Sequence, residues 1–263
     1  MIFVNIIVLF FGLVIGSFLN VVIYRLPRKL SVVWGRSFCP KCKKKIKWFD
    51  NVPLVSYLVL KGHCRSCHSP ISFRYPLVEL STGIITVLIF NFKFSIFNQF
   101  EIFQLLNFKT IFDIFSYLVL GWGLIAIFFI DLEHQIIPDE IVIPLIIIFT
   151  LRFILIGNYR LILVGLVSFL FLFLIYFFTK GKGMGVGDVK LSFLMGLSLG
   201  FPKVILAFYI AFLTGAIAGV ILILAKKAKL KQKIAFGPFL SLGTIIACIW
   251  GENILKILEK LLF

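Results

Sequence analysis

The segment at residues 183–191 reads Gly-Met-Gly-Val-Gly-Asp-Val-Lys-Leu and stands between two long apolar runs. Its aspartate, Asp188, is the only acidic residue between Glu140 and Glu252. A carboxylate at the edge of hydrocarbon is costly to keep ionised, so it needs a partner. The neighbouring glycines permit backbone torsions closed to other residues and let another segment approach closely. One interpretation makes Asp188 a helix N-cap; another pairs it with Asp131, at the end of an earlier apolar run.

Apolar residues dominate the rest of the chain, making up 61% of its 263 residues with a mean hydropathy of +1.10. Several runs reach the roughly 18 residues that cross a bilayer core, which excludes an ordinary soluble domain. The first run lacks a small-residue cleavage site and is expected to be a retained span rather than a removed signal peptide. We expect an all-α polytopic membrane protein with about eight transmembrane helices, near 2–24, 76–92, 112–130, 139–156, 160–178, 188–201, 203–225 and 236–255.

Most of the Lys and Arg residues behind the net charge of +16 lie in loops between the apolar segments, a distribution typical of membrane proteins. The loops on one side hold 20 of the 27 Lys and Arg residues; they are 25–75, 131–138, 179–190 and 225–235. The positive-inside rule assigns these loops to the cytoplasm. The excess charge is therefore interpreted as a topology signal that also attracts anionic lipid headgroups, and no nucleic-acid partner is expected.

Four cysteines form two close pairs in residues 25–75, the only sizeable polar region. Cys39 and Cys42 are separated by 21 residues from Cys64 and Cys67. This spacing is typical of a tetrahedral four-cysteine zinc site, and four protein ligands leave no open position, so the zinc is expected to be structural. Two disulfides are the alternative, which a reducing cytoplasm disfavours. The sequence predicts a small cytoplasmic zinc-knuckle domain between spans 1 and 2.

Asp131 lies in an unfavourable position for stability alone. It ends a span, where the helix dipole favours cations, and that misplacement points to function. Asp139 and Glu140 instead open the next span, where acids are stabilising. Asp131 and Asp188 are expected at the same membrane depth, where two adjacent carboxyl groups would share one proton. Such a pair can activate a water molecule for attack on a peptide carbonyl.

Several segments spread over nearly the whole chain resemble those of type IV prepilin peptidases, the bacterial leader peptidases of the aspartic GxGD class. They are Gly16-Ser17-Phe18-Leu19-Asn20-Val21, Arg25-Leu26-Pro27, the two cysteine pairs, Arg74-Tyr75-Pro76-Leu77-Val78-Glu79-Leu80, Asp131 with Ile137-Pro138-Asp139, and Gly185-Val186-Gly187-Asp188-Val189-Lys190-Leu191. The resemblance implies a hydrolase of the bacterial inner membrane, facing the cytoplasm. It would cut short basic leaders from prepilins or pseudopilins of type IV pilus or type II secretion systems.

The resemblance also implies roles for particular residues. Asp131 and Asp188 match the catalytic aspartates, within an active-site loop that includes Gly185, Gly187 and Lys190. Relatives with the cysteine-bearing loop also methylate the new N-terminus, using S-adenosylmethionine. The polar residues nearest that loop are candidates for methyl transfer; they are Asn20, Arg25, Arg74 and Glu79. The implied organisation is span 1 at 1–24, the zinc-binding, methyltransferase-associated domain at 25–75 and the membrane-embedded peptidase domain at 76–263.

Two other functions compete with this interpretation. A proton-coupled transporter could use Asp131 and Asp188 as a relay, since membrane acids are common in transporters. Transporters usually place such acids near mid-membrane in repeated halves, however, and no internal repeat is visible here. A zinc-bearing membrane scaffold would leave Asp131 unexplained.

Overall fold

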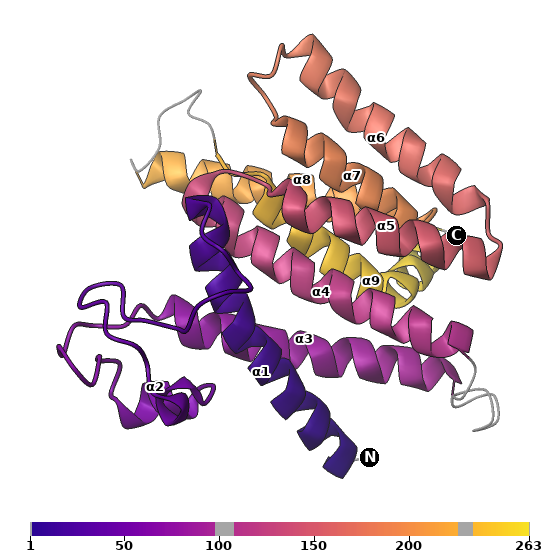
Figure 1. The fold of residues 1–263 in the computed structure, drawn as a ribbon. Coiled ribbons are helices and arrows are strands. Elements are labelled where there is room, and N and C mark those ends of the chain that lie inside the picture. Colours follow the sequence, from indigo (N-terminus) through magenta and orange to yellow (C-terminus); the bar gives the residue numbers. More distant parts are fainter. Residues whose placement is uncertain (1, 98–107, 226–233, 263) are drawn as a thin grey trace. The chain divides into compact units, whose positions relative to one another are not determined.

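Helices form nearly all the regular structure in the computed structural model, which describes residues 2–97, 108–225 and 234–262 (Figure 1). Within those ranges there is no strand, and two isolated antiparallel bridges are the only β pairing. The all-α prediction is confirmed. The helices in chain order are α1 (Ile2–Arg25), η1 (Leu26–Arg28), η2 (Trp48–Asn51), α2 (Val55–Val59), α3 (Arg74–Phe97), α4 (Phe108–His134), α5 (Asp139–Ile156), α6 (Arg160–Phe178), α7 (Val186–Leu199), α8 (Lys203–Leu224) and α9 (Gly237–Leu262).

The long helices coincide with the eight apolar segments expected to span a membrane. Among the described residues, six helices are long and apolar enough to do so: α1, α3, α4, α6, α8 and α9. Helix α5 carries three charged side chains, those of Asp139, Glu140 and Arg152. Helix α7 has 14 residues, and at 1.5 Å per residue it is about 21 Å long, shorter than a bilayer core of about 30 Å. The expected number of about eight spans is therefore approximate.

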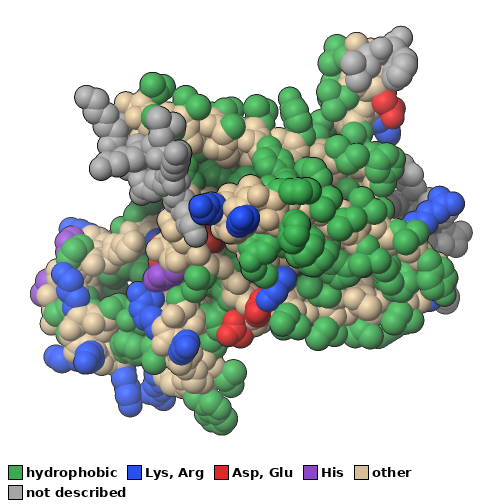
Figure 2. Space-filling view, turned by 90° about the horizontal axis from the view of Figure 1, so that it is seen from above, with side chains coloured by type: hydrophobic (Ala, Val, Ile, Leu, Met, Phe, Trp, Pro, Cys, Tyr) green, Lys and Arg blue, Asp and Glu red, His purple; other side chains and the backbone are tan. Residues whose placement is uncertain are grey.

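The surface of the molecule is largely apolar. Hydrophobic side chains cover most of the face seen in Figure 2, and Lys and Arg side chains gather in limited areas of it. Large apolar side chains stay exposed along the outer helices, for example Phe10 on α1 and Leu163 and Phe178 on α6. A surface of this kind is stable in lipid, where no water has to be excluded.

The chain divides into two compact units, Met1–Phe100 and Glu101–Phe263. In the first unit, α1 packs along α3 with very close backbone approach. A Cβ atom added at Gly16 would lie 2.7 Å from Cα of Glu79, and one at Gly12 would lie 2.8 Å from Cα of Gly83. Gly12 and Gly16 therefore form a small face that lets α3 pack closely on α1.

The second unit is a bundle of six helices, α4 to α9. Helix α7 packs against α5, α6, α8 and α9, and α9 also packs against α4 and α8. This packing gathers the C-terminal end of α4 and the N-terminal ends of α7 and α9, because Ile137 lies against both Gly187 and Gly237. The basic loop expected at 225–235 lies largely outside the described residues.

Candidate active site and metal centre

Asp188 lies in the first turn of α7 and is 7% exposed. Gly185 is the N-cap residue of this helix, and its backbone N–H donates a 2.9 Å hydrogen bond to Oδ2 of Asp188. Asp188 is therefore not itself the N-cap; it lies three residues later and satisfies the N–H of the cap. Its second oxygen, Oδ1, is buried and has no hydrogen-bond partner among the described residues. One oxygen thus fixes the carboxyl group, and the other is left for chemistry.

Asp131 lies in the last turn of α4 and is 5% exposed. The backbone N–H of Gly237, the first residue of α9, donates a 2.9 Å hydrogen bond to its Oδ2. A free N–H at a helix N-terminus is a favourable partner for a carboxylate. Asp131 is therefore held from outside its own helix, by a segment far along the chain.

The structure brings these two aspartates into one region of the second unit. The side chain of Ile137 lies between their supporting glycines, because a Cβ at Gly187 would lie 2.8 Å from Cβ of Ile137 and one at Gly237 would lie 3.0 Å from its Cδ1. A Cβ at Gly237 would also lie 2.7 Å from Oδ2 of Asp131, and one at Gly185 would lie 3.4 Å from Oδ2 of Asp188. Two buried carboxyl groups from different helices therefore lie in one region of the bundle, on either side of Ile137.

Lys190 and Asp139 form an ion pair beside this site. Nζ of Lys190 on α7 donates to both carboxylate oxygens of Asp139 on α5, each at 2.8 Å. Both side chains are partly exposed. Asp139 thus lies in the first turn of α5 as expected, and it also ties α5 to α7.

Sequence reasoning missed Gly237 as a partner of the site. The segment Phe236-Gly237-Pro238 marks the start of a helix, but a backbone N–H carries no side-chain signal of what it binds. Proline at the second position of α9 shows only that a helix begins there. The sequence shows Ile137 only as part of the segment Ile137-Pro138-Asp139. It does not show that this side chain lies between Gly187 and Gly237.

The four paired cysteines come together in the first unit. Their Sγ atoms all lie within 4.8 Å of one another, and those of Cys39 and Cys67 are 3.9 Å apart. Zinc–sulfur bonds of about 2.3 Å in a tetrahedron place sulfur atoms about 3.8 Å apart. The thiols therefore form a cluster of the size that a metal ion requires.

The two cysteine pairs have the same backbone geometry. In the first pair, the backbone N–H of Cys39 donates to the carbonyl oxygen of Lys44, and the N–H of Lys43 donates to that of Cys39. In the second pair, the N–H of Cys64 donates to the carbonyl oxygen of Ser69, and the N–H of His68 donates to that of Cys64. The fifth residue of each turn, Lys43 or His68, has a positive φ. Each turn is closed by one isolated bridge. Two copies of one turn that present their thiols to a common centre are typical of a metal-binding knuckle.

The pKa values of these thiols show that the four sulfur atoms interact with one another, as expected at a site for a cation. Hydrogen bonds from the hydroxyl and the backbone N–H of Ser69 lower the pKa of Cys67 to about 6. The pKa of Cys42 rises to about 11, because desolvation and the neighbouring thiols outweigh a backbone hydrogen bond from Lys44. Four thiolates at such short range repel one another, and a divalent cation among them removes that repulsion. The cluster can therefore hold a metal ion.

The candidates for methyl transfer lie near this domain in the first unit. Nδ2 of Asn20 donates to the carbonyl oxygen of Tyr75 at 3.0 Å, a hydrogen bond that joins α1 to α3. The guanidinium of Arg25 is buried and donates to four carbonyl oxygens at 2.8–3.2 Å, those of Ser31, Trp34, Gly35 and Arg36.

Glu79 and Arg74 complete this set of four. Oε2 of Glu79 accepts a 2.8 Å hydrogen bond from the backbone N–H of Leu54, and the guanidinium of Arg74 lies 4.9 Å from the ring centre of Tyr75. Arg25 and Glu79 thus hold the loops of residues 26–73 onto α1 and α3.

Together these features define a multi-pass membrane protein with a buried pair of carboxyl groups and a four-thiol metal site. The profile of the type IV leader peptidase family matches residues 118–220, and that of the bacterial peptidase A24 N-terminal domain matches residues 10–92. Proteins named prepilin leader peptidase/N-methyltransferase are similar along most of their length. The one from Pseudomonas aeruginosa is 33% identical over 93% of this chain and 90% of its own, and the one from Legionella pneumophila 35% over 97% and 94%.

The relative from Aeromonas salmonicida is 34% identical over 95% of this chain and 91% of its own. The chain therefore belongs to the type IV leader peptidase family. No solved structure matches it significantly.

Proposed function

We propose that this protein cleaves the short basic leader from type IV prepilins or pseudopilins and then methylates the new N-terminal amine. The observation that carries the proposal is the pair of buried carboxyl groups, Asp131 and Asp188, each fixed by a backbone N–H from a helix N-terminus. The curated relatives carry both activities in their names. The family and the apolar helices make this a multi-pass protein of the bacterial inner membrane.

In the proposed cleavage step, one aspartate is ionised and the other protonated. Oδ1 of Asp188 takes a proton from water, and the oxygen of that water bonds to the scissile carbonyl carbon. Asp131 in its protonated form donates to the carbonyl oxygen. The tetrahedral intermediate then breaks its C–N bond, and the leaving amine takes the proton held by Asp188. The carbonyl group re-forms as the oxygen protonated by Asp131 returns its proton to that aspartate, so the pair regains its starting state. The products are a leader with a new carboxylate and a mature pilin with a free N-terminal amine.

The segment around Asp188 supports this step. Gly185 orients the carboxyl group through its N–H, and Gly187 allows Ile137 to pack at a distance that a side chain would prevent. Lys190 holds α7 to α5 through Asp139. We propose Gly185, Gly187 and Lys190 as positioning residues. The expected active-site loop is the start of α7, because Gly185 is the N-cap and Gly187 and Lys190 lie within the helix.

We assign a structural zinc ion to Cys39, Cys42, Cys64 and Cys67. Only three residues between 26 and 73 are fully buried, Cys39, Pro53 and Gly62. So small a core does not stabilise a domain, and zinc binding supplies the missing free energy. The ion has no open coordination position and takes no part in cleavage.

The proposed methyl donor is S-adenosylmethionine, which supplies an electrophilic methyl group when it is bound. The relatives' names are the support for it. The polar atoms of Arg25 and Glu79 already bind backbone groups, so these two residues fit a positioning role for the loops better than direct contact with the donor. Asn20 keeps a buried Oδ1 without a hydrogen-bond partner among the described residues, and it is the candidate that we favour for contact.

We further propose that these activities divide along the chain. Residues 1–24 form the first span, residues 25–75 the zinc-binding domain associated with methyl transfer, and residues 76–263 the peptidase domain. The excess of Lys and Arg in the loops on one side supports a cytoplasmic position for the site. The transporter alternative has no support from the comparisons.

The test is cleavage of a co-expressed model prepilin by Asp131→Asn and Asp188→Asn variants. Each is expected to abolish cleavage, because amides cannot exchange the required proton, while zinc content and expression match the unmodified chain. Mass spectrometry of the pilin reports the cut site and any added methyl group together. Undiminished cleavage by either variant would remove that aspartate from the catalytic pair.

A further inference from the structure

The part of the cysteine-bearing domain between its two knuckles presents apolar side chains to the outside. We define the η2–α2 face by Lys47, Trp48, Phe49, Val55, Leu58 and Val59, all of which are exposed. Trp48 is 83% exposed and Leu58 73%. These are unusually high values for large apolar side chains of a folded domain.

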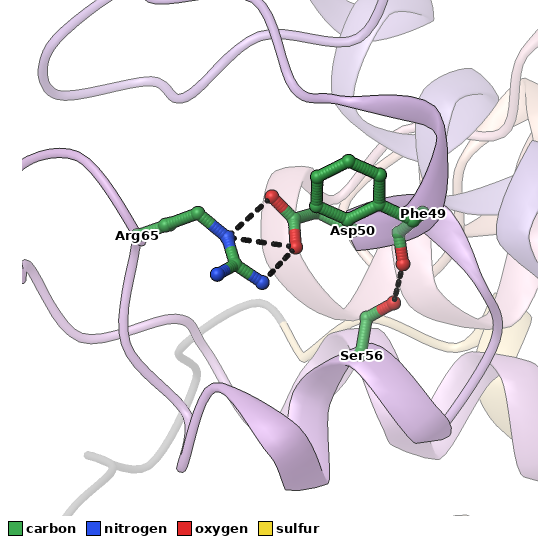
Figure 3. A network of polar contacts seen from close by, with 4 residues as sticks. All are labelled: Phe49, Asp50, Ser56 and Arg65. Carbon is green, nitrogen blue, oxygen red and sulfur yellow. Dashed lines mark hydrogen bonds and ion pairs between the residues drawn. The ribbon is translucent and has the colours of Figure 1, made fainter.

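The apolar side of helix α2 is exposed and does not face the interior of the domain. Val55, Leu58 and Val59 have the spacing i, i+3, i+4, so they share one side of the helix, and they point away from the domain. The hydroxyl of Ser56, which is only partly exposed, donates to the carbonyl oxygen of Phe49 at 3.1 Å and so ties α2 to η2 (Figure 3). A helix whose apolar side faces outward requires an apolar environment there.

The η2–α2 face is attached to the first turns of α3, a helix long and apolar enough to span a membrane. The N–H of Leu54, the residue before α2, donates to Oε2 of Glu79, which lies on α3 five residues after its start at Arg74. Leu54 has a φ of 59°, a strained value for leucine that this partly buried hydrogen bond stabilises. Tyr57 also packs edge-on against Phe73, just before α3. The η2–α2 face therefore flanks the end of a span and does not project away from it.

The charge beside the face is strongly positive. Residues 25–75 contain twelve Lys and Arg residues and one acid, Asp50. That acid is already bound by Arg65 in a bidentate ion pair, with contacts of 2.7–3.1 Å (Figure 3). Lys43, Lys44, Lys45 and Lys47 precede Trp48 within five residues, and all are exposed.

We propose that the η2–α2 face is an interfacial anchor, which docks onto the anionic phospholipid headgroups of the bilayer that α1 and α3 cross. Tryptophan beside lysine is favoured at the boundary of headgroups and acyl chains, and basic segments next to a span are attracted to anionic lipid. A basic prepilin leader would be repelled by the same lysines, and so would a second copy of this face. Docking of this kind would hold the cysteine-bearing domain against the membrane, independently of the proposed catalytic roles.

Bromolipid quenching of Trp48 tests the proposal in the full chain. In a variant with Trp34, Trp122 and Trp250 replaced by Phe, Trp48 is the only tryptophan. The protein is reconstituted in phosphatidylcholine vesicles with or without one-third phosphatidylglycerol, made with lipids brominated in the upper acyl chain. We expect strong quenching of Trp48 in the anionic vesicles and weaker quenching in the neutral ones. Should the triple variant fail to fold, the difference in quenching between the unmodified chain and Trp48→Phe gives the same readout.

Four substitutions separate docking from general effects. Leu58→Ser is expected to abolish most of the quenching, and Lys47→Gln to lower the docked-to-undocked ratio about fivefold in anionic vesicles. Val33→Ser and Lys41→Gln are the matched controls, since Val33 and Lys41 are also exposed in the same domain and lie outside the face. All four variants should keep their zinc.

Two results would overturn the proposal. One is equal quenching in neutral and anionic vesicles, or none in either. The other is protection of Trp48 from both bromolipid and aqueous iodide, which would mean that protein, a second copy or another part of this chain, covers the face.

Discussion

The backbone N–H of Gly237 donates a 2.9 Å hydrogen bond to Oδ2 of Asp131, which lies 106 residues earlier in the chain. Asp188 receives the corresponding bond from Gly185, only three residues away. One aspartate of the pair is therefore positioned locally and the other by tertiary packing. The position of Asp131 depends on how α9 packs against α4.

Gly237→Ala should damage the site without unfolding the protein. A Cβ at this position would lie 2.7 Å from Oδ2 of Asp131 and 3.0 Å from Cδ1 of Ile137, so the carboxyl group or α9 must shift. Misplacement of a catalytic group by about 1 Å can lower the rate about 100-fold. We expect a loss of this size in kcat/KM for a model prepilin, with zinc content unchanged.

The matched control for this change is Gly219→Ala, in the middle of α8. The nearest atom that its Cβ would meet is 3.7 Å away, an ordinary contact distance. This variant should cleave as the unmodified chain does. If Gly237→Ala also retained full activity, the hydrogen bond to Asp131 would have no catalytic importance.

Signals that are local in the sequence were sufficient to predict much of this fold. The apolar runs predicted the long helices, because the length of an apolar segment is set by bilayer thickness. The two cysteine pairs predicted a common cluster, since each pair needs only one short turn to present both thiols. The close contact of α1 with α3 at Gly12 and Gly16 has an equally local cause, because a missing side chain is visible in the sequence itself.

Contacts made by backbone groups could not be predicted in this way. The N–H of Gly237 and that of Leu54 reach Asp131 and Glu79 only through tertiary packing. Arg25 illustrates the same limit, because its charge and position made it a candidate for cofactor contact, whereas its guanidinium binds four loop carbonyls. Side-chain chemistry indicates what a residue can bind, and the partner is decided by the fold.

The ion pair between Lys190 and Asp139 is expected to contribute little to stability. Both side chains are more than a third exposed, so water and salt screen the attraction and its net value is at most about 1 kcal/mol. A double-mutant cycle with Lys190→Ala and Asp139→Ala, followed by thermal unfolding in detergent, measures the coupling. The coupling should shrink further at high salt. A coupling several times larger would show that the pair is desolvated in the folded protein.

The buried pair of Arg152 and Asp113 should behave in the opposite way. Nη2 of Arg152 lies 2.6 Å from Oδ1 of Asp113, and both side chains are nearly buried between α4 and α5. Arg152→Met would remove a buried cationic partner of the Asp113 carboxylate and should destabilise the protein, by up to about 3–5 kcal/mol. The double variant with Asp113→Asn should recover part of that loss.

Arg160→Met serves as the control for Arg152→Met, because Arg160 is exposed at the start of α6. It should leave the unfolding temperature almost unchanged. An equally small effect of Arg152→Met would mean that Asp113 is satisfied without the arginine.

Metal removal should unfold the cysteine-bearing domain and spare the helices. Only Cys39, Pro53 and Gly62 are fully buried between residues 26 and 73, so little but the metal site and the contacts of Arg25 and Glu79 holds these loops. We expect one zinc ion per chain by metal analysis, and its loss in Cys39→Ser. Limited trypsin digestion should then cut at the lysines of residues 41–47 in the variant or after chelation, while the helical content by circular dichroism stays near that of the unmodified chain.

Cys248→Ala, which changes the buried cysteine of α9, should keep both the zinc and the resistance to trypsin. Equal resistance with and without metal would show that the domain is stable by itself and that the four thiols have another purpose.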